Sequence, residues 1–200
     1  MRFLAFADSH ASFYGTKEIV KLASQVDMVI CAGDFTDFGN FADTLLQQME
    51  ILDKILWFVT GNHEDENPKL LEQISQNYPW VKNLEGIFVV KEEITFCGCS
   101  YRASERYARS PYSQELENLV KKIKNYHRSV FVTHCPPAEC EVAFTKTGDD
   151  GGSSRIRAFV EKYQPELVLC GHIHRPLQRE CRIGKSLIIN ISFLYQIFEL

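Results

Sequence analysis

Five short runs of apolar residues, each about as long as one β-strand, recur along the chain. Their residues are mainly Val, Ile, Leu and Phe, without the polar alternation of a half-exposed strand. Such runs are typical of strands that are buried on both faces of a parallel sheet. The runs are residues 2–7, 27–32, 55–60, 129–134 and 166–171. Because both faces of such strands must be covered, the chain is predicted to fold in the α/β class.

The segments between these runs have apolar residues at helical spacing. They are residues 15–24, 39–53, 67–77, 113–125 and 153–163. Ser153 or Ser154 is well placed to cap the last helix. From about 86 to 98, and from 177 to the C-terminus, the pattern changes to alternation and predicts hairpins, with a turn at 182–186. We therefore expect parallel strands with antiparallel strands added.

The composition limits the function classes. With 200 residues, 45% of them hydrophobic, the chain can bury a sizeable core, and we expect one domain over residues 1–200. The net charge of −4, with mixed signs throughout, argues against a long nucleic acid as partner. The apolar runs are too short for a membrane-spanning helix, and the first reaches Asp8 too early for a signal-peptide core. The seven cysteines form no paired framework, so a reduced, cytoplasmic location is expected, and Cys97-Gly-Cys99 is interpreted as part of a strand.

Polar residues follow each of the five apolar runs. In chain order they are Asp8 and His10; Asp34 and Asp37; Asn62, His63 and Glu64; His134; and His172 and His174. Ligands of α/β sheets bind beyond the carboxyl ends of the strands, so these loops are expected to converge on one rim. Glycines at 33, 61 and 171 would let the backbone turn sharply there.

The polar residues suit a pair of divalent transition metals. Imidazole and carboxylate groups without cysteine argue against a structural zinc site and favour Mn, Fe, Zn or Ni in a catalytic one. The candidate ligands are Asp8, His10, Asp34, Asn62, His134, His172 and His174. This set is too large for one tetrahedral ion, but it suits two ions that share a carboxylate, roughly 3.5–4 Å apart.

The order of these motifs resembles that of the calcineurin-like metallophosphoesterases. The motifs are Asp8-x-His10, Gly33-Asp34-x-x-Asp37, Gly61-Asn62-His63-Glu64, His134 and Gly171-His172-x-His174, and they span residues 6–174. The resemblance implies a four-layer αββα sandwich with two mixed β-sheets, helices outside, and a metal site at the carboxyl ends of the strands.

The resemblance also implies a role for each site residue. The first metal would be held by Asp8, His10, Asp34 and His174, and the second by Asp34, Asn62, His134 and His172, with Asp34 as the bridge. His63 would be the acid near the leaving oxygen, oriented by Asp37. Asn62 and His63 would contact the substrate.

Two such ions would hold a bridging hydroxide at neutral pH, since metal binding lowers the pKa of water to about 7. That hydroxide would attack phosphorus in line, and His63 would protonate the leaving alkoxide. The stretches "THCPP", "GDDGGSS" and "GHIH" are similar to the small metallophosphoesterase-domain proteins and their prokaryotic relatives. This similarity implies hydrolysis of cyclic nucleotides or other small phosphodiesters. Phe38 stands where the protein phosphatase branch has a phosphate-binding arginine, which argues against a phosphoprotein substrate.

Three other interpretations stay open: a broad phosphomonoesterase, a metal-binding interaction module without catalysis, and a nuclease. Arg102, Arg106 and Arg109 are either a clamp for the substrate phosphate or part of a solvated loop. The loop at 148–152 is interpreted as a mobile rim loop, and the subunits are candidates for a homodimer.

Overall fold

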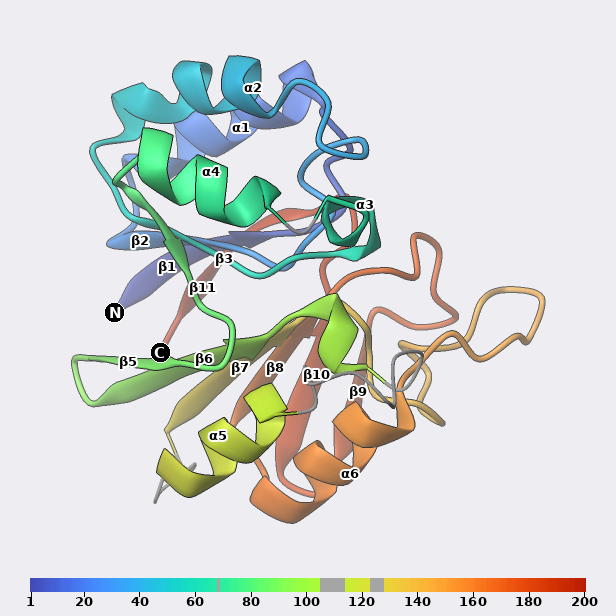
Figure 1. The fold of residues 1–200 in the computed structure, drawn as a ribbon. Coiled ribbons are helices and arrows are strands. Elements are labelled where there is room, and N and C mark those ends of the chain that lie inside the picture. The colour runs from blue at the N-terminus through green and yellow to red at the C-terminus, as the bar shows by residue number, and fades with distance from the viewer. Residues whose placement is uncertain (68, 105–113, 123–127) are drawn as a thin grey trace.

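The computed structural model describes residues 1–67, 69–104, 114–122 and 128–200, which form two β-sheets packed face to face (Figure 1). One sheet has the strand order β11-β1-β2-β3-β4 and the other β5-β6-β7-β8-β10-β9. The strands are β1 (Arg2–Phe6), β2 (Met28–Cys31), β3 (Leu56–Phe58), β4 (Val81–Asn83), β5 (Phe88–Lys91), β6 (Ile94–Cys99), β7 (Ser129–Thr133), β8 (Leu167–Cys170), β9 (Glu180–Ile183), β10 (Ser186–Asn190) and β11 (Tyr195–Glu199).

Helices cover the outer faces of both sheets (Figure 1). The α-helices are α1 (Phe13–Ala23), α2 (Ala42–Met49), α3 (Asn62–Asp65), α4 (Leu70–Asn77), α5 (Gln114–Lys122) and α6 (Ser154–Tyr163), and 3₁₀ turns cover Glu50–Leu52 and Tyr101–Ala103. In each sheet, parallel strands carry antiparallel partners at the edges: β11 on β1, β5 on β6 and β9 on β10. The predicted αββα sandwich with two mixed sheets is confirmed.

Alternate residues of each central strand pack on opposite sides, and both sides are apolar. In β1, Phe3 and Ala5 face the core between the sheets, whereas Leu4 and Phe6 face the helices. The outer core of the first sheet is built with Ile19, Leu45, Met49 and Ile74 from α1, α2 and α4. The continuous apolar runs in the sequence are the direct result of this double burial.

The second sheet repeats this arrangement. Phe131 of β7 stacks on Phe159 of α6, with ring centroids 4.5 Å apart. Cys97 and Cys99 of β6 lie in the same outer core, and their thiols contact Val130 O and Thr133 Oγ1. These cysteines therefore belong to a buried strand, as the sequence indicated.

The structure corrects two predictions from alternation and spacing. The hairpin predicted after residue 177 exists as β9 and β10, but β11 leaves it and pairs antiparallel with β1 in the other sheet. The helix predicted over 39–53 is shorter, since α2 covers Ala42–Met49 and a 3₁₀ turn follows. At α6, Ser153 is the N-cap, and its side chain accepts a hydrogen bond from Ile156 N at 3.3 Å.

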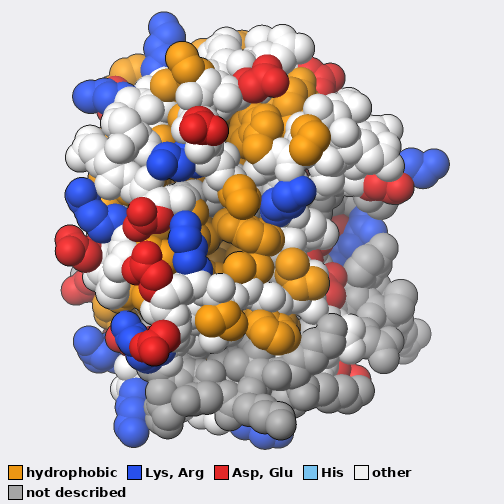
Figure 2. Space-filling model, turned by 90° about the vertical axis from the view of Figure 1, so that its left-hand side faces the viewer, with side chains coloured by type: hydrophobic (Ala, Val, Ile, Leu, Met, Phe, Trp, Pro, Cys, Tyr) orange, Lys and Arg blue, Asp and Glu red, His pale blue; other side chains and the backbone are white. Residues whose placement is uncertain are grey.

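Figure 2 shows the side of the molecule where Figure 1 places the two chain ends and the turn between β5 and β6. Hydrophobic side chains gather across its middle, among Lys, Arg, Asp and Glu. Phe88 and Val90 of β5 are 39% and 60% exposed. The homodimer stays a prediction. None of the helices that the structure describes is long and apolar enough to cross a membrane.

Candidate metal centre

The polar loops that follow β1, β2, β3, β7 and β8 meet at one end of the sandwich. The residues brought together there are Asp8, His10, Asp34, Asn62, His63, His134, His172 and His174. These loops lie at the carboxyl ends of parallel strands of both sheets, as expected for a site of an α/β fold.

One cluster consists of Asp8, His10, Asp34 and His174, whose ligand atoms all lie within 4.8 Å of one another. The Nε2 atoms of His10 and His174 are 3.0 Å apart. His174 Nε2 is also 3.3 Å from Asp8 Oδ1, and His10 Nε2 is 3.9 Å from both Asp8 Oδ1 and Asp34 Oδ2. Two imidazole nitrogens directed at the same carboxylates form a donor set suited to a divalent cation.

A second cluster surrounds the amide oxygen of Asn62. This oxygen is 3.1 Å from His134 Nε2 and 2.9 Å from His172 Nδ1. His134 Nε2 is also 3.4 Å from Asp34 Oδ2. The same carboxylate oxygen of Asp34 therefore approaches both clusters and is the atom through which two ions could be bridged.

Other bonds orient these side chains. The second ring nitrogen of His134, Nδ1, contacts Ala32 O at 2.9 Å, which turns Nε2 toward the site. Asp8 Oδ2 accepts hydrogen bonds from Ser192 Oγ at 2.7 Å and from the His172 backbone N at 3.1 Å. Outer bonds of this kind fix the tautomer and direction of metal ligands.

The buried charges of the centre require compensation. Asp8, Asp34 and His134 are at most 1% exposed, and buried charges in proteins are paired or bind metals. Burial raises the pKa of Asp34, but the neighbouring His134 imidazole outweighs it and holds this pKa below its usual range. Burial lowers the pKa of His134, but the Asp34 carboxylate outweighs it and raises this pKa to about 9. A cation that bound here would replace the His134 proton, so the residues fit a pair of divalent ions.

Several of these residues have an unusual backbone conformation. The φ angles of Asp8, His10, Asp34 and His172 are 56°, 42°, 50° and 69°, in the left-handed region. This conformation is uncommon for residues other than glycine and concentrates at functional sites. The loops that carry them bond to each other, with Asp8 N to Gly33 O and His10 N to Asp34 O, both at 3.0 Å.

Glu64 connects the loops after β2 and β3. Its carboxylate is 1% exposed and accepts hydrogen bonds from Asp34 N at 2.9 Å, Gly61 N at 3.0 Å and both Thr36 N and Oγ1. Burial raises the pKa of Glu64, and Asp34 raises it further. Gly61 matters for its lack of a side chain, because a Cβ there would lie 2.1 Å from Asp34 Oδ1.

His63 lies beside both clusters. Its Nε2 is 3.9 Å from Asp34 Oδ2, and its Nδ1 is 3.2 Å from Asp37 Oδ1. The His63 side chain remains 18% exposed, and Phe38 stacks on it with ring centroids 4.0 Å apart. His63 and Asp37 therefore lie together beside the two clusters, and their roles as acid and orienting carboxylate stay predictions.

Asn190 supports the centre and was missed by the sequence analysis. Its side-chain amide donates to Gly171 O at 3.1 Å and Ile173 O at 3.0 Å, and its Oδ1 accepts from Ser192 N at 3.0 Å. It thus holds the loop that carries His172 to the loop that carries Ser192. Its signal in the sequence is a polar residue within the apolar stretch "LIINI".

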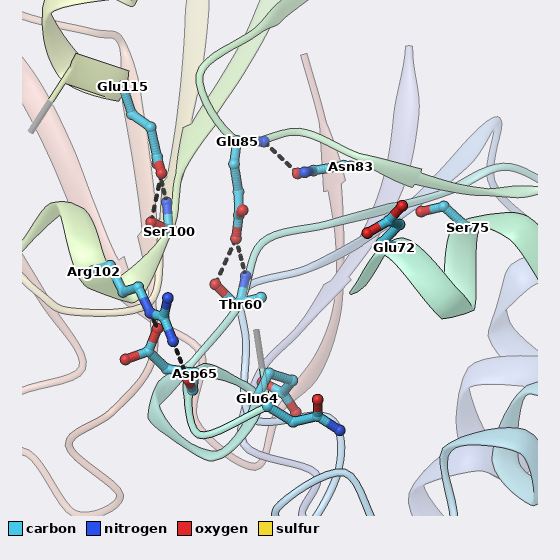
Figure 3. Close-up of a pocket in the computed structure, with 11 residues that line it drawn as sticks. Thr60, Glu64, Asp65, Glu72, Ser75, Asn83, Glu85, Ser100, Arg102 and Glu115 are labelled. Atoms are coloured by element: carbon cyan, nitrogen blue, oxygen red, sulfur yellow. Dashed lines mark hydrogen bonds and ion pairs between the residues drawn. The ribbon is translucent and has the colours of Figure 1, made fainter. Parts of the chain in front are cut away.

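Arg102 lines an acidic pocket together with Glu64, Asp65, Glu72, Glu85 and Glu115 (Figure 3). Its guanidinium contacts the side chain and backbone oxygens of Asp65. The pocket has a volume of about 370 Å³, and Glu85 in it accepts hydrogen bonds from Thr60 N and Oγ1.

Arg106 and Arg109 lie outside the described residues. In the predicted rim loop, Asp150 accepts hydrogen bonds from Glu139 N and Gly152 N.

The sequence model of the calcineurin-like phosphoesterase family matches residues 1–176. The chain belongs to this family. Its fold, and the cluster of candidate metal ligands at the strand ends, are those of a metal-dependent phosphohydrolase of this family.

Solved structures similar to this calcineurin-like phosphoesterase include a phosphopantetheinyl hydrolase from Mycobacterium tuberculosis, with a TM-score of 0.64, 15% identity, and coverage of 96% of this chain and 89% of that one. A dimetal phosphatase from Danio rerio has a TM-score of 0.64 and 13% identity, with 96% and 87% covered. An archaeal phosphodiesterase has a TM-score of 0.56 and 15% identity, with 96% and 84% covered. At these identities the similarity establishes the fold alone. No curated protein sequence matches the chain significantly.

Replacing Glu64 by Gln is expected to weaken metal binding by about ten- to a hundredfold. One oxygen becomes an NH₂ group that faces backbone N–H donors, so the loops that carry Asp34 and Asn62 lose their common anchor. Titration of Mn²⁺ by calorimetry measures the change. Glu66→Gln, at an exposed position two residues away, is the matched control, and equal affinities in both variants would contradict the anchoring role.

Replacing Glu85 by Gln is expected to reduce the loss of thermal stability with rising pH. Burial and the nearby Glu115 raise the pKa of Glu85 to about 7. Because the folded state binds this proton more tightly than the unfolded chain, its contribution to stability is present at low pH and is lost as pH rises through 7. The glutamine keeps an oxygen for Thr60.

The measurement is the melting temperature of the wild type and the variant between pH 5 and pH 8. The difference between the two should grow in favour of Glu85→Gln as pH rises. Glu72→Gln, an exposed carboxylate that lines the same pocket, should follow the wild type. A constant difference for Glu85→Gln across this range would show that Glu85 does not titrate there.

Proposed function

We propose that this protein is a binuclear metal-dependent phosphoesterase that hydrolyses small phosphodiesters, with cyclic nucleotide-like esters as its substrate class. The observation that carries the proposal is the position of Asp34. Its Oδ2 approaches His10 of one ligand cluster and His134 of the other, at 3.9 Å and 3.4 Å. His63, a histidine outside both ligand sets, lies 3.9 Å from the same oxygen.

Seven residues would hold the ions in two sets. The first set is Asp8, His10, Asp34 and His174, and the second is Asp34, Asn62, His134 and His172. When bound, two divalent ions supply an activated water and neutralise the charge on phosphate oxygens. The candidate metals are Mn, Fe, Zn and Ni. Asn62, which precedes His63 in the chain, would also contact the phosphate.

His63 would donate a proton to the leaving oxygen from Nε2. Its Nδ1 lies 3.2 Å from Asp37 Oδ1, and a carboxylate at this position would orient the ring. The exposed side of His63 gives it access to the ester oxygen. A positioned acid of this kind accelerates a reaction by about 10²–10⁴-fold.

A diester is favoured over a monoester because residue 38 is a phenylalanine and not an arginine. Phe38 covers one face of His63 there, where an arginine would bind the additional charge of a phosphomonoester. The similarity in fold to an archaeal phosphodiesterase is consistent with this choice. Substrate-binding roles for Arg102 and Arg106 stay predictions.

The test is a substrate panel with Mn²⁺ present: bis-p-nitrophenyl phosphate, p-nitrophenyl phosphate, and 2′,3′- and 3′,5′-cyclic nucleotides. We expect kcat/KM to be higher for the bis ester than for the monoester. A tenfold advantage for the monoester would replace this proposal with a broad phosphomonoesterase. Absence of turnover with full metal content would favour a metal-binding module. Asp34→Asn should lower both metal content and activity more than any other ligand change.

Replacing His63 by Ala is expected to lower kcat by about 10²–10⁴-fold without reducing the bound metal. The loss should depend on the leaving group. A p-nitrophenolate leaves with little assistance, whereas a ribose alkoxide requires a proton, so a cyclic nucleotide should be affected far more.

Asp37→Asn should show a weaker form of the same dependence, because it disorients the acid without removing it. Metal analysis and kinetics on both substrates are the measurements. Equal losses on the two substrates, or loss of metal, would show that His63 is not the acid.

A further inference from the structure

Two phenylalanines extend the histidines of the centre into one row of rings. Phe38 stacks on His63 with centroids 4.0 Å apart and an interplanar angle of 22°. His63 is 4.4 Å from His10, which is 4.9 Å from His174. His174 in turn is 4.7 Å from Phe193. Phe193 also lies 6.0 Å from His10, so the row bends at His174, and a phenyl ring stands at each of its ends.

Burial does not account for either phenyl ring. Phe38 and Phe193 are each 48% exposed, although the chain has large apolar cores on every side of its sheets. Their φ angles, 53° and 57°, lie in the left-handed region, which is unfavourable for a bulky side chain and concentrates at ligand-binding positions. The fold thus holds two half-exposed rings beside the candidate metal centre, on residues whose left-handed backbone conformation is intrinsically unfavourable.

The surrounding backbone fixes both positions. Phe193 N donates to Ala7 O at 3.1 Å, directly before the first ligand of the chain. The turn of Phe38 is closed by Gly39 N to Thr36 Oγ1 at 3.1 Å, and Thr36 is in turn bonded to Glu64. The two rings are therefore tied to the same loops that carry the metal ligands.

We propose that Phe38 and Phe193 bind the organic groups of the substrate, and that these groups are planar and aromatic, as in a nucleobase or an aryl ester. This proposal rests on the function proposed above and names the part of the substrate outside the phosphate. Phe38 borders the leaving group, because it covers the acid His63. Phe193 borders the group that stays on phosphorus, because it lies at the opposite end of the row.

The chemistry favours a flat ring over other occupants. Exposed aromatic faces stack on bases and aryl groups, and this stacking is tolerant of the identity of the base. The two phenyl rings border different histidines of the polar centre, Phe38 against His63 and Phe193 against His174 and His10, which matches a phosphate with two flat substituents. A long aliphatic chain would require a continuous apolar channel.

The test compares two diesters with the same leaving group. Bis-p-nitrophenyl phosphate and methyl p-nitrophenyl phosphate both release p-nitrophenol, but the first retains an aryl group and the second a methyl group. Phe193→Ala should lower kcat/KM for the bis ester by about tenfold while changing the methyl ester little. Phe38→Ala should lower both, because the leaving group is the same.

Two further variants separate stacking from apolar contact. Phe193→Tyr keeps a ring and should retain the preference for the aryl ester, whereas Phe193→Leu keeps an apolar side chain and should lose it. Phe41→Ala is the matched control. Phe41 is 58% exposed and has a φ of 61°, but it contacts Phe13 instead of a histidine, with centroids 6.1 Å apart. Its removal should leave the ratio of the two esters unchanged.

Equal losses on both esters in Phe193→Ala would overturn the proposal and make Phe193 a support for His174. If the wild type turns over neither ester, the proposed function fails, and binding decides the present inference. Calorimetry with phenyl phosphate and methyl phosphate should then show tighter binding of phenyl phosphate by the wild type alone. Equal binding of the two compounds by the wild type would overturn the inference independently of turnover.

Discussion

The bonds of one buried carboxylate join two loops of the candidate metal centre. Glu64 accepts hydrogen bonds from Asp34 N, Thr36 and Gly61 N, so the loops after β2 and β3 cannot move separately. A carboxylate that is 1% exposed is stable only when donors surround it. The loops must therefore adopt these positions to satisfy Glu64, and Asp34, Asn62 and His63 are placed as a consequence.

The candidate site combines a charged, buried part with an aromatic, exposed part. The buried end of the centre is dominated by opposite charges, with Asp34 beside His134. The exposed end is formed by His63 and by the phenyl rings of Phe38 and Phe193. A phosphoester has the same division between a charged centre and its organic substituents. This division is the structural basis of the small-ester substrate that we propose.

Most of the fold could be predicted because the central strands are buried on both faces, and this leaves unbroken apolar runs in the sequence. The strand β4 could not, since only Val81 of its residues is buried. The pairing of β11 with β1 also escaped prediction, because an alternating pattern shows that a strand has one covered face without naming its neighbour.

The convergence of the candidate ligands was predictable for a related reason: each follows a strand, and strand ends in such sheets meet. The supporting residues were not. Asn190 and Ser192 act on the loop of His172 and on Asp8, which are distant in the sequence. Arg102 was a candidate for binding phosphate, and only the folded chain shows its contact with Asp65. The sequence shows that Phe38 stands in place of a phosphate-binding arginine, but its stacking on His63 depends on tertiary structure.

The double burial of the central strands has a consequence for how their alignment is selected. If β1 slid by one residue, Leu4 and Phe6 would exchange sides with Phe3 and Ala5, and apolar groups would still meet apolar groups. Burial of apolar side chains therefore disfavours such a shift only weakly. In a sheet with one solvent-exposed face, the same shift would bring polar residues into the core. The slip would, however, displace Asp8 from Ser192 and from the backbone of Gly33. The polar residues at the strand ends thus select the correct alignment of β1, and Asp8 serves this purpose as well as being a candidate metal ligand.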